Sequence, residues 1–276
     1  MLNEVVKELK LEKGVFGVEG TLPFRFYRML VESSNIVAED ASAVFSQLRI
    51  IKSEEELRTM QKAAEIVAEG IKAGIEFIRA GVSELAISSE IERTIKENGG
   101  ESVPFCIVLS GPNSALPHGE TTSRKVDAKD VVLMDIGAVY DGYYADVTRT
   151  VFVGEATEKQ REIYNVVAQA EEAAIKTVRP GIKAEEVDAA ARNVIEKAGY
   201  GRYFTHRTGH GLGLEVHEEP YISQGNTTVL KPGMTFTIEP GIYLPREFGV
   251  RIEDDIAVSE NKGRPLSNLA KELTTV

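Results

Sequence analysis

The sequence from 131 to 152, VVLMDIGAVYDGYYADVTRTVF, indicates the class of fold. An apolar run at 131–136 is followed by a second run of β-forming residues at 142–152. Each run carries an acidic residue, Asp135 in the first and Asp146 in the second. A carboxylate within an apolar strand is costly to bury unless a positive group meets it. The stretch therefore predicts two strands whose carboxylates require a cation.

Two helices and one more strand are expected ahead of this pair. Ser53 and Glu56 form an S-x-x-E capping box at the start of 53–79, where apolar residues recur at steps of three and four. A second helix at 83–98 ends at a glycine pair, which tolerates the left-handed conformation of a helix end. A strand-like apolar run follows at 105–109. The order is thus helix, helix and then strands.

The same order of elements recurs at an offset near 100 residues. Helices are expected from Thr157 to about residue 178 and at 184–198, with strands at 234–238 and 250–258. The two passes also share residues in register, at offsets of 100 and 104: Arg79-Ala80-Gly81 with Arg179-Pro180-Gly181, Gly99 with Gly199, and Asp135-Ile136-Gly137 with Glu239-Pro240-Gly241. Two helices followed by antiparallel strands, repeated, predict a duplicated α+β domain with pseudo-two-fold symmetry.

Composition excludes several classes of protein. With 276 residues, of which 42% are hydrophobic and 27% charged, the chain is not of the disordered, fibrous or membrane-spanning type. The net charge of −11 excludes a general nucleic-acid binder, because phosphate contact needs a basic face. The single cysteine, Cys106, excludes an internal disulfide and suits a reducing compartment. We therefore expect a cytoplasmic protein with no nucleic-acid or membrane partner.

The repeat lies within residues 47–276, and residues 1–46 precede it. Within the first part, 14–20 has the pattern of a strand and 23–31 that of a short helix. A segment of this length alone is too small for an independent core. We therefore expect a small N-terminal part followed by the main domain.

The acidic residues within strand patterns suggest a metal site. These residues are Asp135, Asp146, Glu239 and Glu253, and the four histidines, His118, His206, His210 and His217, all lie within one hundred residues. Four carboxylates and one imidazole fit two divalent cations, because four negative charges offset two dications. Hard oxygen donors with one histidine suit Mn²⁺, Co²⁺, Fe²⁺ or Zn²⁺, whereas a structural zinc site would use thiolates.

Other catalytic motifs are not satisfied. His217 and Glu218 open like H-E-x-x-H, but Pro220 breaks any helix there and no histidine follows at the required position. No G-x-S-x-G of a serine hydrolase occurs. Cys106 lies in an apolar run and is expected to be a core thiol. We expect the glycines around His210 to give a metal or a substrate close access to the backbone.

Seven short motifs in chain order resemble those of one enzyme family, the pita-bread dinuclear metallopeptidases. Five of them are Met-Asp135-Ile-Gly, Ala-Asp146-Val-Thr-Arg-Thr, Gly-His210-Gly-Leu-Gly, Ile-Glu239-Pro-Gly and Arg-Ile-Glu253-Asp. The other two, Ser-Ala-Leu-Pro-His118-Gly and Val-His217-Glu-Glu-Pro, resemble the proline-directed branch, the prolidases and aminopeptidases P. The resemblance runs from about residue 47 to the C-terminus. It implies an α+β pita-bread domain of the creatinase/aminopeptidase type, with an antiparallel curved sheet and outer helices.

The resemblance also implies a role for each motif residue. Asp135 would chelate one metal ion, His210 and Glu239 the other, and Asp146 and Glu253 would bridge the two. His118 and His217 would face the substrate and move protons, and Glu239 is a further candidate for proton relay. Four residues are expected to support the site or contact the substrate: His206, Tyr221, Arg251 and Thr148.

The implied reaction is hydrolysis of Xaa-Pro peptide bonds by a hydroxide that two divalent metal ions activate. Mn²⁺ and Co²⁺ are the first candidates, and Fe²⁺ and Zn²⁺ are alternatives. A prolidase acting on dipeptides is the first interpretation. An aminopeptidase P acting on longer peptides is the second, because some prolidases carry arginine where this chain has Tyr221. A peptide-binding module without catalysis is the third.

The resemblance finally bears on the N-terminal part and on assembly. Residues 1–46 resemble only the closing section of the N-terminal creatinase/prolidase-type domain that the family usually carries. The chain is therefore expected to be either a short homologue or a fragment. A homodimer is implied as well, because that domain helps to dimerise the relatives.

Overall fold

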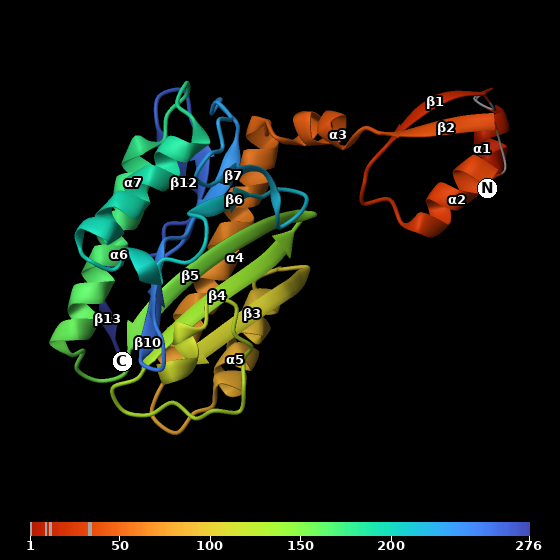
Figure 1. Cartoon of the computed structure of the whole chain (residues 1–276). Helices are drawn as coiled ribbons and strands as arrows, with labels where there is room; N and C mark the ends of the chain where they lie inside the picture. Colours follow the sequence, from red (N-terminus) through yellow and green to blue (C-terminus); the bar gives the residue numbers. More distant parts are fainter. Residues whose placement is uncertain (1, 9, 11–12, 33–34) are drawn as a thin grey trace. The chain divides into compact units, whose positions relative to one another are not determined.

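The computed structural model (Figure 1) describes residues 2–8, 10, 13–32 and 35–276, and the chain divides into two compact units, Met1–Arg49 and Ile50–Val276. The elements of the first unit are α1 (Leu2–Glu8), β1 (Lys13–Val18), α2 (Phe24–Glu32), β2 (Asn35–Asp40) and α3 (Ser42–Arg49). Strands β1 and β2 pair in parallel, and Val6, Leu30 and Ile36 pack together in a small apolar cluster. The strand and helix expected at 14–20 and 23–31 correspond to β1 and α2.

The second unit begins with two helices and three long strands. They are α4 (Glu54–Phe77), α5 (Glu84–Glu97), β3 (Ser102–Ser110), the 3-10 helix η1 (Gly111–Ala115), β4 (Val131–Tyr140) and β5 (Tyr143–Phe152). The predicted capping box of α4 is confirmed, because the Ser53 side chain accepts from the Glu56 N–H while the Glu56 carboxylate accepts from the Ser53 N–H. Strands β3, β4 and β5 pair antiparallel, and β13 (Thr274–Thr275) extends the sheet alongside β5 in parallel.

The second half of this unit repeats the order of helices and strands. It contains α6 (Glu158–Thr177), α7 (Ala184–Lys197), the 3-10 helix η2 (Gly201–Tyr203), β6 (Gly209–Gly211), β7 (Glu218–Ile222), β8 (Thr235–Ile238), β9 (Gly241–Leu244), β10 (Phe248–Arg251), β11 (Asp254–Val258) and β12 (Gly263–Pro265). Five strands form a sheet in the order β12-β11-β8-β6-β7, and β9 pairs with β10. One expected element differs, because 250–258 is two strands that belong to different sheets.

The duplication is visible in matching backbone hydrogen bonds. At the start of α5, the Glu84 N–H donates to the Arg124 carbonyl oxygen at 3.0 Å, and at the start of α7 the Ala184 N–H donates to Thr228 at 2.9 Å. Isolated bridges also correspond, Ser83 with Lys125 and Lys183 with Val229. The first residues of α5 and α7 are 100 residues apart, and the carbonyl groups that bind them are 104 apart, as the sequence register predicts. The pseudo-two-fold repeat is therefore a property of the fold.

The helices cover the sheets on one side, and two apolar clusters lie beneath them, one mainly in each half. In the first half, α4 and α5 pack on β3, β4 and β5, and Gly74 of α4 lies so close to Ile91 of α5 that a Cβ there would meet its side chain at 2.7 Å. In the second half, α6 and α7 pack on each other and on the strands from β7 to β12. None of the helices in the described ranges combines the length and hydropathy that a membrane span requires.

The two halves meet along β5 and β10. The Thr150 hydroxyl donates to the Arg251 carbonyl oxygen at 2.8 Å, and the Arg251 N–H donates to the same hydroxyl oxygen at 3.2 Å. Two residues further on, the Glu253 N–H donates to the Thr148 carbonyl oxygen at 3.1 Å. These bonds bring the acidic residues of the two repeats together.

Candidate metal centre

Strands β4 and β5 place two carboxylates on one face of their sheet. Asp135 lies opposite Thr148 and Asp146 lies opposite Gly137 in the antiparallel register. Side chains of directly opposed residues share a face, and so do residues two apart in one strand. Asp135, Asp146 and Thr148 therefore project to the same side, which the motif spacing alone does not show.

Strand β6 brings His210 to this face from the second half. The strand lies between β7 and β8, and the His210 N–H donates to the Thr237 hydroxyl at 3.1 Å. A Cβ on Gly209 would lie 1.8 Å from the Thr237 carbonyl oxygen, and one on Gly211 would lie 2.4 Å from the Glu219 carbonyl oxygen. The glycines thus allow close approach to the neighbouring strands, and the expected access for a metal or a substrate stays a prediction.

Glu239 and Glu253 complete the cluster. Glu239 follows β8 and accepts a hydrogen bond from the Thr237 hydroxyl at 3.1 Å, while its Oε1 lies 3.5 Å from Nε2 of His210. Glu253 lies between β10 and β11 and accepts a hydrogen bond from the Thr148 hydroxyl. Ligand atoms of Asp146, His210 and Glu253 all lie within 4.8 Å of one another. This spacing suits a shared cation.

A cavity of about 500 Å³ opens over the cluster. Its lining includes all five residues expected to be metal ligands, together with His118, His206, His217 and Arg251. Thr148 and Tyr221, the remaining two expected site residues, are not part of the lining. Thr148 instead lies beneath it, bonded to Glu253 and Arg251, and Tyr221 contacts the lining residue Arg207. The structure thus brings the expected residues to one place.

The electrostatics of the cluster fit divalent cations. Burial, with repulsion from Glu253 and Asp135, raises the pKa of Asp146 well above its ordinary value. Burial, with repulsion from Asp135 and against the attraction of Arg251, raises the pKa of Glu239 to about 7. Burial also raises the pKa of Glu253 well above its usual range. These shifts show that positive charge is deficient here, and divalent cations would supply it.

Two further observations agree with metal binding. Oδ1 of Asp146 is buried with no hydrogen-bond partner among the described residues. A buried carboxylate oxygen without a partner is rare unless an ion or water completes it. Burial and the neighbouring His217 lower the pKa of His210 to about 3, so its ring is neutral and can offer a lone pair. The donor set of four carboxylates and one neutral imidazole therefore fits hard divalent cations.

Arg251 is a buried cation that contacts the cluster. Its guanidinium forms an ion pair with Asp135, lies 3.7 Å from Glu253 and donates to the Thr148 hydroxyl at 3.1 Å. Nη1 also donates to the Tyr243 hydroxyl at 2.9 Å. Tyr243 was not expected from the sequence, because it has no motif of its own. Its position in β9, which pairs with β10, is what brings it to Arg251.

The histidines differ in their surroundings. The His217 ring lies edge-on to that of His210, with centroids 4.1 Å apart, and is exposed. His206 is held on both sides, by the Tyr243 hydroxyl at 2.9 Å from Nε2 and by the Arg207 carbonyl at 2.7 Å from Nδ1. Burial and the charge of Arg251 lower the pKa of His206 to about 4, so it is neutral near pH 7. His118 lies 6.5 Å from His206 between ring centroids.

Arg207 is a lining residue that the sequence analysis missed. Its guanidinium carbon lies 4.4 Å from the ring centroid of Tyr221, in cation–π contact. No carboxylate of the described part of the chain lies within ion-pair distance of it. It is thus an exposed cation on the wall of a cavity whose floor is acidic. The only sequence signal was its place between His206 and His210.

Comparisons with known proteins agree with this geometry. The model of metallopeptidase family M24 matches residues 58–260. The Xaa-Pro dipeptidase of Pyrococcus horikoshii is 43% identical over 99% of this chain and 78% of its own length. The solved prolidase from Pyrococcus furiosus has a TM-score of 0.92 and 42% identity, over 98% of this chain and 80% of that one.

A relative with a different name is also similar. The solved X-Pro aminopeptidase from Thermotoga maritima has a TM-score of 0.91 and 36% identity, over 100% of this chain and 78% of that one. The predicted family and fold are therefore confirmed. The chain belongs to metallopeptidase family M24 and has the pita-bread fold of the prolidases and aminopeptidases P.

Proposed function

We propose that this metallopeptidase is an Xaa-Pro dipeptidase. The observation that carries the proposal is the convergence of Asp135, Asp146, His210, Glu239 and Glu253 at one cavity, with His118 and His217 on its wall. The similarity to proteins named Xaa-Pro dipeptidase and prolidase supports the choice of substrate. A cavity of about 500 Å³ lies within the range of small-ligand sites.

The proposed metal ligands come from both repeats. Asp135 would hold one divalent ion, His210 and Glu239 the other, and Asp146 and Glu253 both. We propose Mn²⁺ or Co²⁺ as the native metal, with Fe²⁺ and Zn²⁺ as alternatives. Bound together, such ions lower the pKa of water and polarise a carbonyl group, which is what amide hydrolysis needs.

The protein's own groups would orient the substrate and move protons. His118 and His217 line the cavity, and each ring would donate a hydrogen bond to the scissile carbonyl oxygen as it becomes negative. The proline nitrogen of an Xaa-Pro bond has no N–H, so it must receive a proton when it leaves. The two histidines are suited to supply it, and Glu239 is a further candidate for the proton relay.

Arg207 favours a dipeptide over a longer peptide. A dipeptide carries a free carboxylate one residue beyond the scissile bond, and a longer peptide has a neutral amide there. The Arg207 guanidinium is stacked on Tyr221 and has no carboxylate partner in the described ranges, so it is preorganised to bind an anion. We propose that it reads the substrate carboxylate, with Tyr221 as its platform.

The activity test compares Ala-Pro with Ala-Pro-Ala after the metal is stripped and each candidate metal is reloaded. A dipeptidase hydrolyses Ala-Pro with the higher kcat/KM. Faster cleavage of Ala-Pro-Ala would indicate the aminopeptidase P alternative instead. Hydrolysis of neither peptide, with metal bound, would favour the peptide-binding module and overturn the proposal.

The role of Arg207 is tested with Ala-Pro and its uncharged carboxamide. In Arg207→Ala, KM for Ala-Pro should rise about tenfold or more while KM for the carboxamide stays constant, because a hydrogen bond to a charged group contributes roughly 1.5–3 kcal/mol. Arg202→Ala is the matched control, since Arg202 also lies over a tyrosine ring, at 4.6 Å, but does not line the cavity. An equal change for both substrates would remove Arg207 from carboxylate recognition.

Three further proposals concern the cellular compartment, the oligomeric state and the domain organisation. One cysteine in the whole sequence suits a reducing compartment, so we propose a cytoplasmic enzyme. We also propose a homodimer, which light scattering of the purified protein would test. Residues 1–46 are proposed to correspond to the closing section of a creatinase/prolidase-type N-terminal domain, ahead of the peptidase domain at 47–276.

A further inference from the structure

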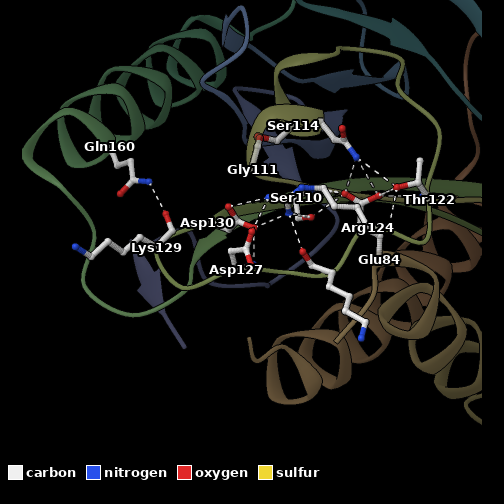
Figure 2. Close-up of polar contacts among 12 residues, drawn as sticks. Glu84, Ser110, Gly111, Ser114, Thr122, Arg124, Asp127, Lys129, Asp130 and Gln160 are labelled. Atoms are coloured by element: carbon white, nitrogen blue, oxygen red, sulfur yellow. Dashed lines mark hydrogen bonds and ion pairs between the residues drawn. The ribbon is translucent and has the colours of Figure 1, made fainter. Parts of the chain in front are cut away.

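A buried carboxylate far from the metal ligands in sequence holds the segment that carries His118. Glu84, in the first turn of α5, is 0% exposed. Its Oε1 accepts from the Ser110 N–H at 2.7 Å, the Ser110 hydroxyl at 2.8 Å and the Asn113 side-chain amide at 3.0 Å. Its Oε2 accepts from the Thr122 N–H at 2.9 Å and the Thr122 hydroxyl at 2.7 Å. Figure 2 shows these bonds converging on one side chain.

The donors lie at the two ends of one loop. Ser110 ends β3 and Thr122 comes twelve residues later, so one carboxylate fixes both ends of 110–122. Arg124 adds a second tie, because Nη1 donates to the Ser110 hydroxyl at 2.6 Å and to Asp130 at 2.6 Å. His118 lies within this loop and lines the cavity.

The far side of the loop contacts β10, the strand that precedes the candidate ligand Glu253. The Gly249 N–H of β10 donates to the Ser114 hydroxyl at 3.0 Å. Nη1 of Arg251 donates to the Pro117 carbonyl oxygen at 3.4 Å, next to His118. The loop is thus held between α5 on one side and β10 on the other.

The repeat provides an internal comparison that separates folding from function. The residue that corresponds to Glu84 in the second half is Ala184, also 0% exposed and also at the start of its helix. The backbone hydrogen bonds of the two junctions match: Glu84 to Arg124 and Leu85 to Thr122 in the first half, and Ala184 to Thr228 and Glu185 to Asn226 in the second. The junction therefore forms without a carboxylate.

The buried carboxylate of α7, Asp188, accepts from the Thr208 N–H and hydroxyl instead and lies away from the start of the helix. A buried charge is costly, and the start of α7 forms without one, so the helix junction itself does not explain Glu84. We propose that Glu84 is a positioning residue for His118, which clamps the loop 110–122 so that the imidazole keeps its place over the candidate metal centre. The inference rests on the proposed peptidase function, in which His118 contacts the substrate. Positioning of a catalytic group within a fraction of an ångström is worth large rate factors.

The test variant is Glu84→Gln, which keeps the size of the side chain. An amide presents an NH₂ group where a carboxylate oxygen accepted, so it faces the donors of Ser110 or Thr122 and cannot bind both ends. Turnover of Ala-Pro should fall at least tenfold with metal content unchanged and KM within about twofold. Thr122→Val removes the hydroxyl bond to Glu84 and keeps the backbone N–H bond, so it should cause a smaller loss, which Thr122→Ser should not show because serine keeps the hydroxyl.

A double-mutant cycle shows whether the effect passes through His118. If Glu84 acts by placing His118, then Glu84→Gln should cost little further kcat in a His118→Ala background. The matched control is Glu171→Gln, a change of another carboxyl that is almost fully buried, in α6, whose effect should be additive with His118→Ala. An additive cycle for Glu84 as well would overturn the proposal, even if its turnover were reduced.

A readout without turnover keeps this inference separate from the proposed function. The ¹H–¹³C ring signals of the four histidines should show His118 shifted or broadened by Glu84→Gln, with His210 unchanged. An unchanged His118 signal would contradict the positioning role. If the wild-type protein hydrolysed neither peptide, the proposed function would fail, while the ring signals would still report on Glu84 and His118.

Discussion

Individual carboxylates in this protein are buried at a cost that protonation or added positive charge relieves. Asp146 and Glu253 are 5% and 2% exposed, and burial raises the pKa of both. Arg251 forms ion pairs with Asp135 and Glu253, and the pKa of Glu253 is still raised well above its ordinary value by burial and by repulsion from Glu239. We therefore expect the loss of a single charge to weaken metal binding most at Asp146 and Glu253.

The first prediction concerns these two residues. Asp146→Asn and Glu253→Gln should each lose most of the bound metal, because each removes one negative charge and an oxygen donor proposed to contact both ions. Elemental analysis of the purified proteins measures this directly, with Glu171→Gln as the control that changes a buried carboxyl outside the cavity. Near-stoichiometric metal in both variants would show that the ligand assignment is wrong.

The second prediction separates His118 from the ligands. His118→Ala should retain its metal but lose about 10²-fold or more in kcat, since a group that acts in the transition state is removed. Steady-state kinetics on Ala-Pro with the metal content measured in the same sample gives both quantities. Unchanged kcat would reduce His118 to a structural residue of the cavity wall.

At the scale of one element, strand β6 is only three residues long and still positions His210. It can do so because Gly209 and Gly211 allow β7 and β8 to close on it from both sides. A strand of only three residues makes few contacts of its own that could fix the orientation of the His210 side chain. Its placement therefore depends on the neighbouring strands.

The third prediction belongs to this strand. Gly209→Ala should lower the free energy of unfolding by about 1–3 kcal/mol or more and weaken metal binding, because its Cβ would lie 1.8 Å from the Thr237 carbonyl oxygen. Thermal unfolding and metal titration measure the two effects. Gly201→Ala is the control, since the nearest atom there is the Glu196 side chain at 2.8 Å, which can move. Equal stability of both variants would contradict the packing argument.

For the whole molecule, the cluster links metal binding to pH. The raised pKa of Glu239 means that, without metal, its protonated form stabilises the fold at low pH, and this stability is lost as pH rises through about 7. Bound cations compensate for the ionised carboxylates and stabilise the folded state by mass action. Stability of the stripped protein should therefore depend on pH more than that of the loaded protein.

The fourth prediction follows from this linkage. The difference in Tm between metal-loaded and metal-stripped protein should be larger at pH 8 than at pH 6, because ionisation of Glu239 and its neighbours destabilises only the stripped form. Scanning calorimetry of both forms at each pH tests it. A difference that is constant or shrinks toward pH 8 would show that these carboxyl groups are not what the metal compensates.

The sequence by itself determined the class of fold and the residues whose side chains can bind metal or take part in catalysis. Capping boxes and apolar periodicity are local, so the starts and ends of α4, α5, α6 and α7 agree with the prediction to within a residue or two. The duplication was readable because it leaves matched residues at a constant offset. The motifs around Asp135, Asp146, His210, Glu239 and Glu253 named the residues that the structure brings to one cavity.

Only the tertiary structure decided the contacts between residues that are distant in sequence. Glu84 binds both ends of the loop that carries His118, and its partners there are 26 and 38 residues away in the sequence. Tyr243 contacts Arg251 because β9 pairs with β10. Arg207 stacks on Tyr221, although other residues separate the two in the sequence. The break between β10 and β11 was missed for the same reason, since β10 pairs with β9 and β11 with β8. Such contacts depend on how sheets and helices pack, which local sequence patterns do not encode.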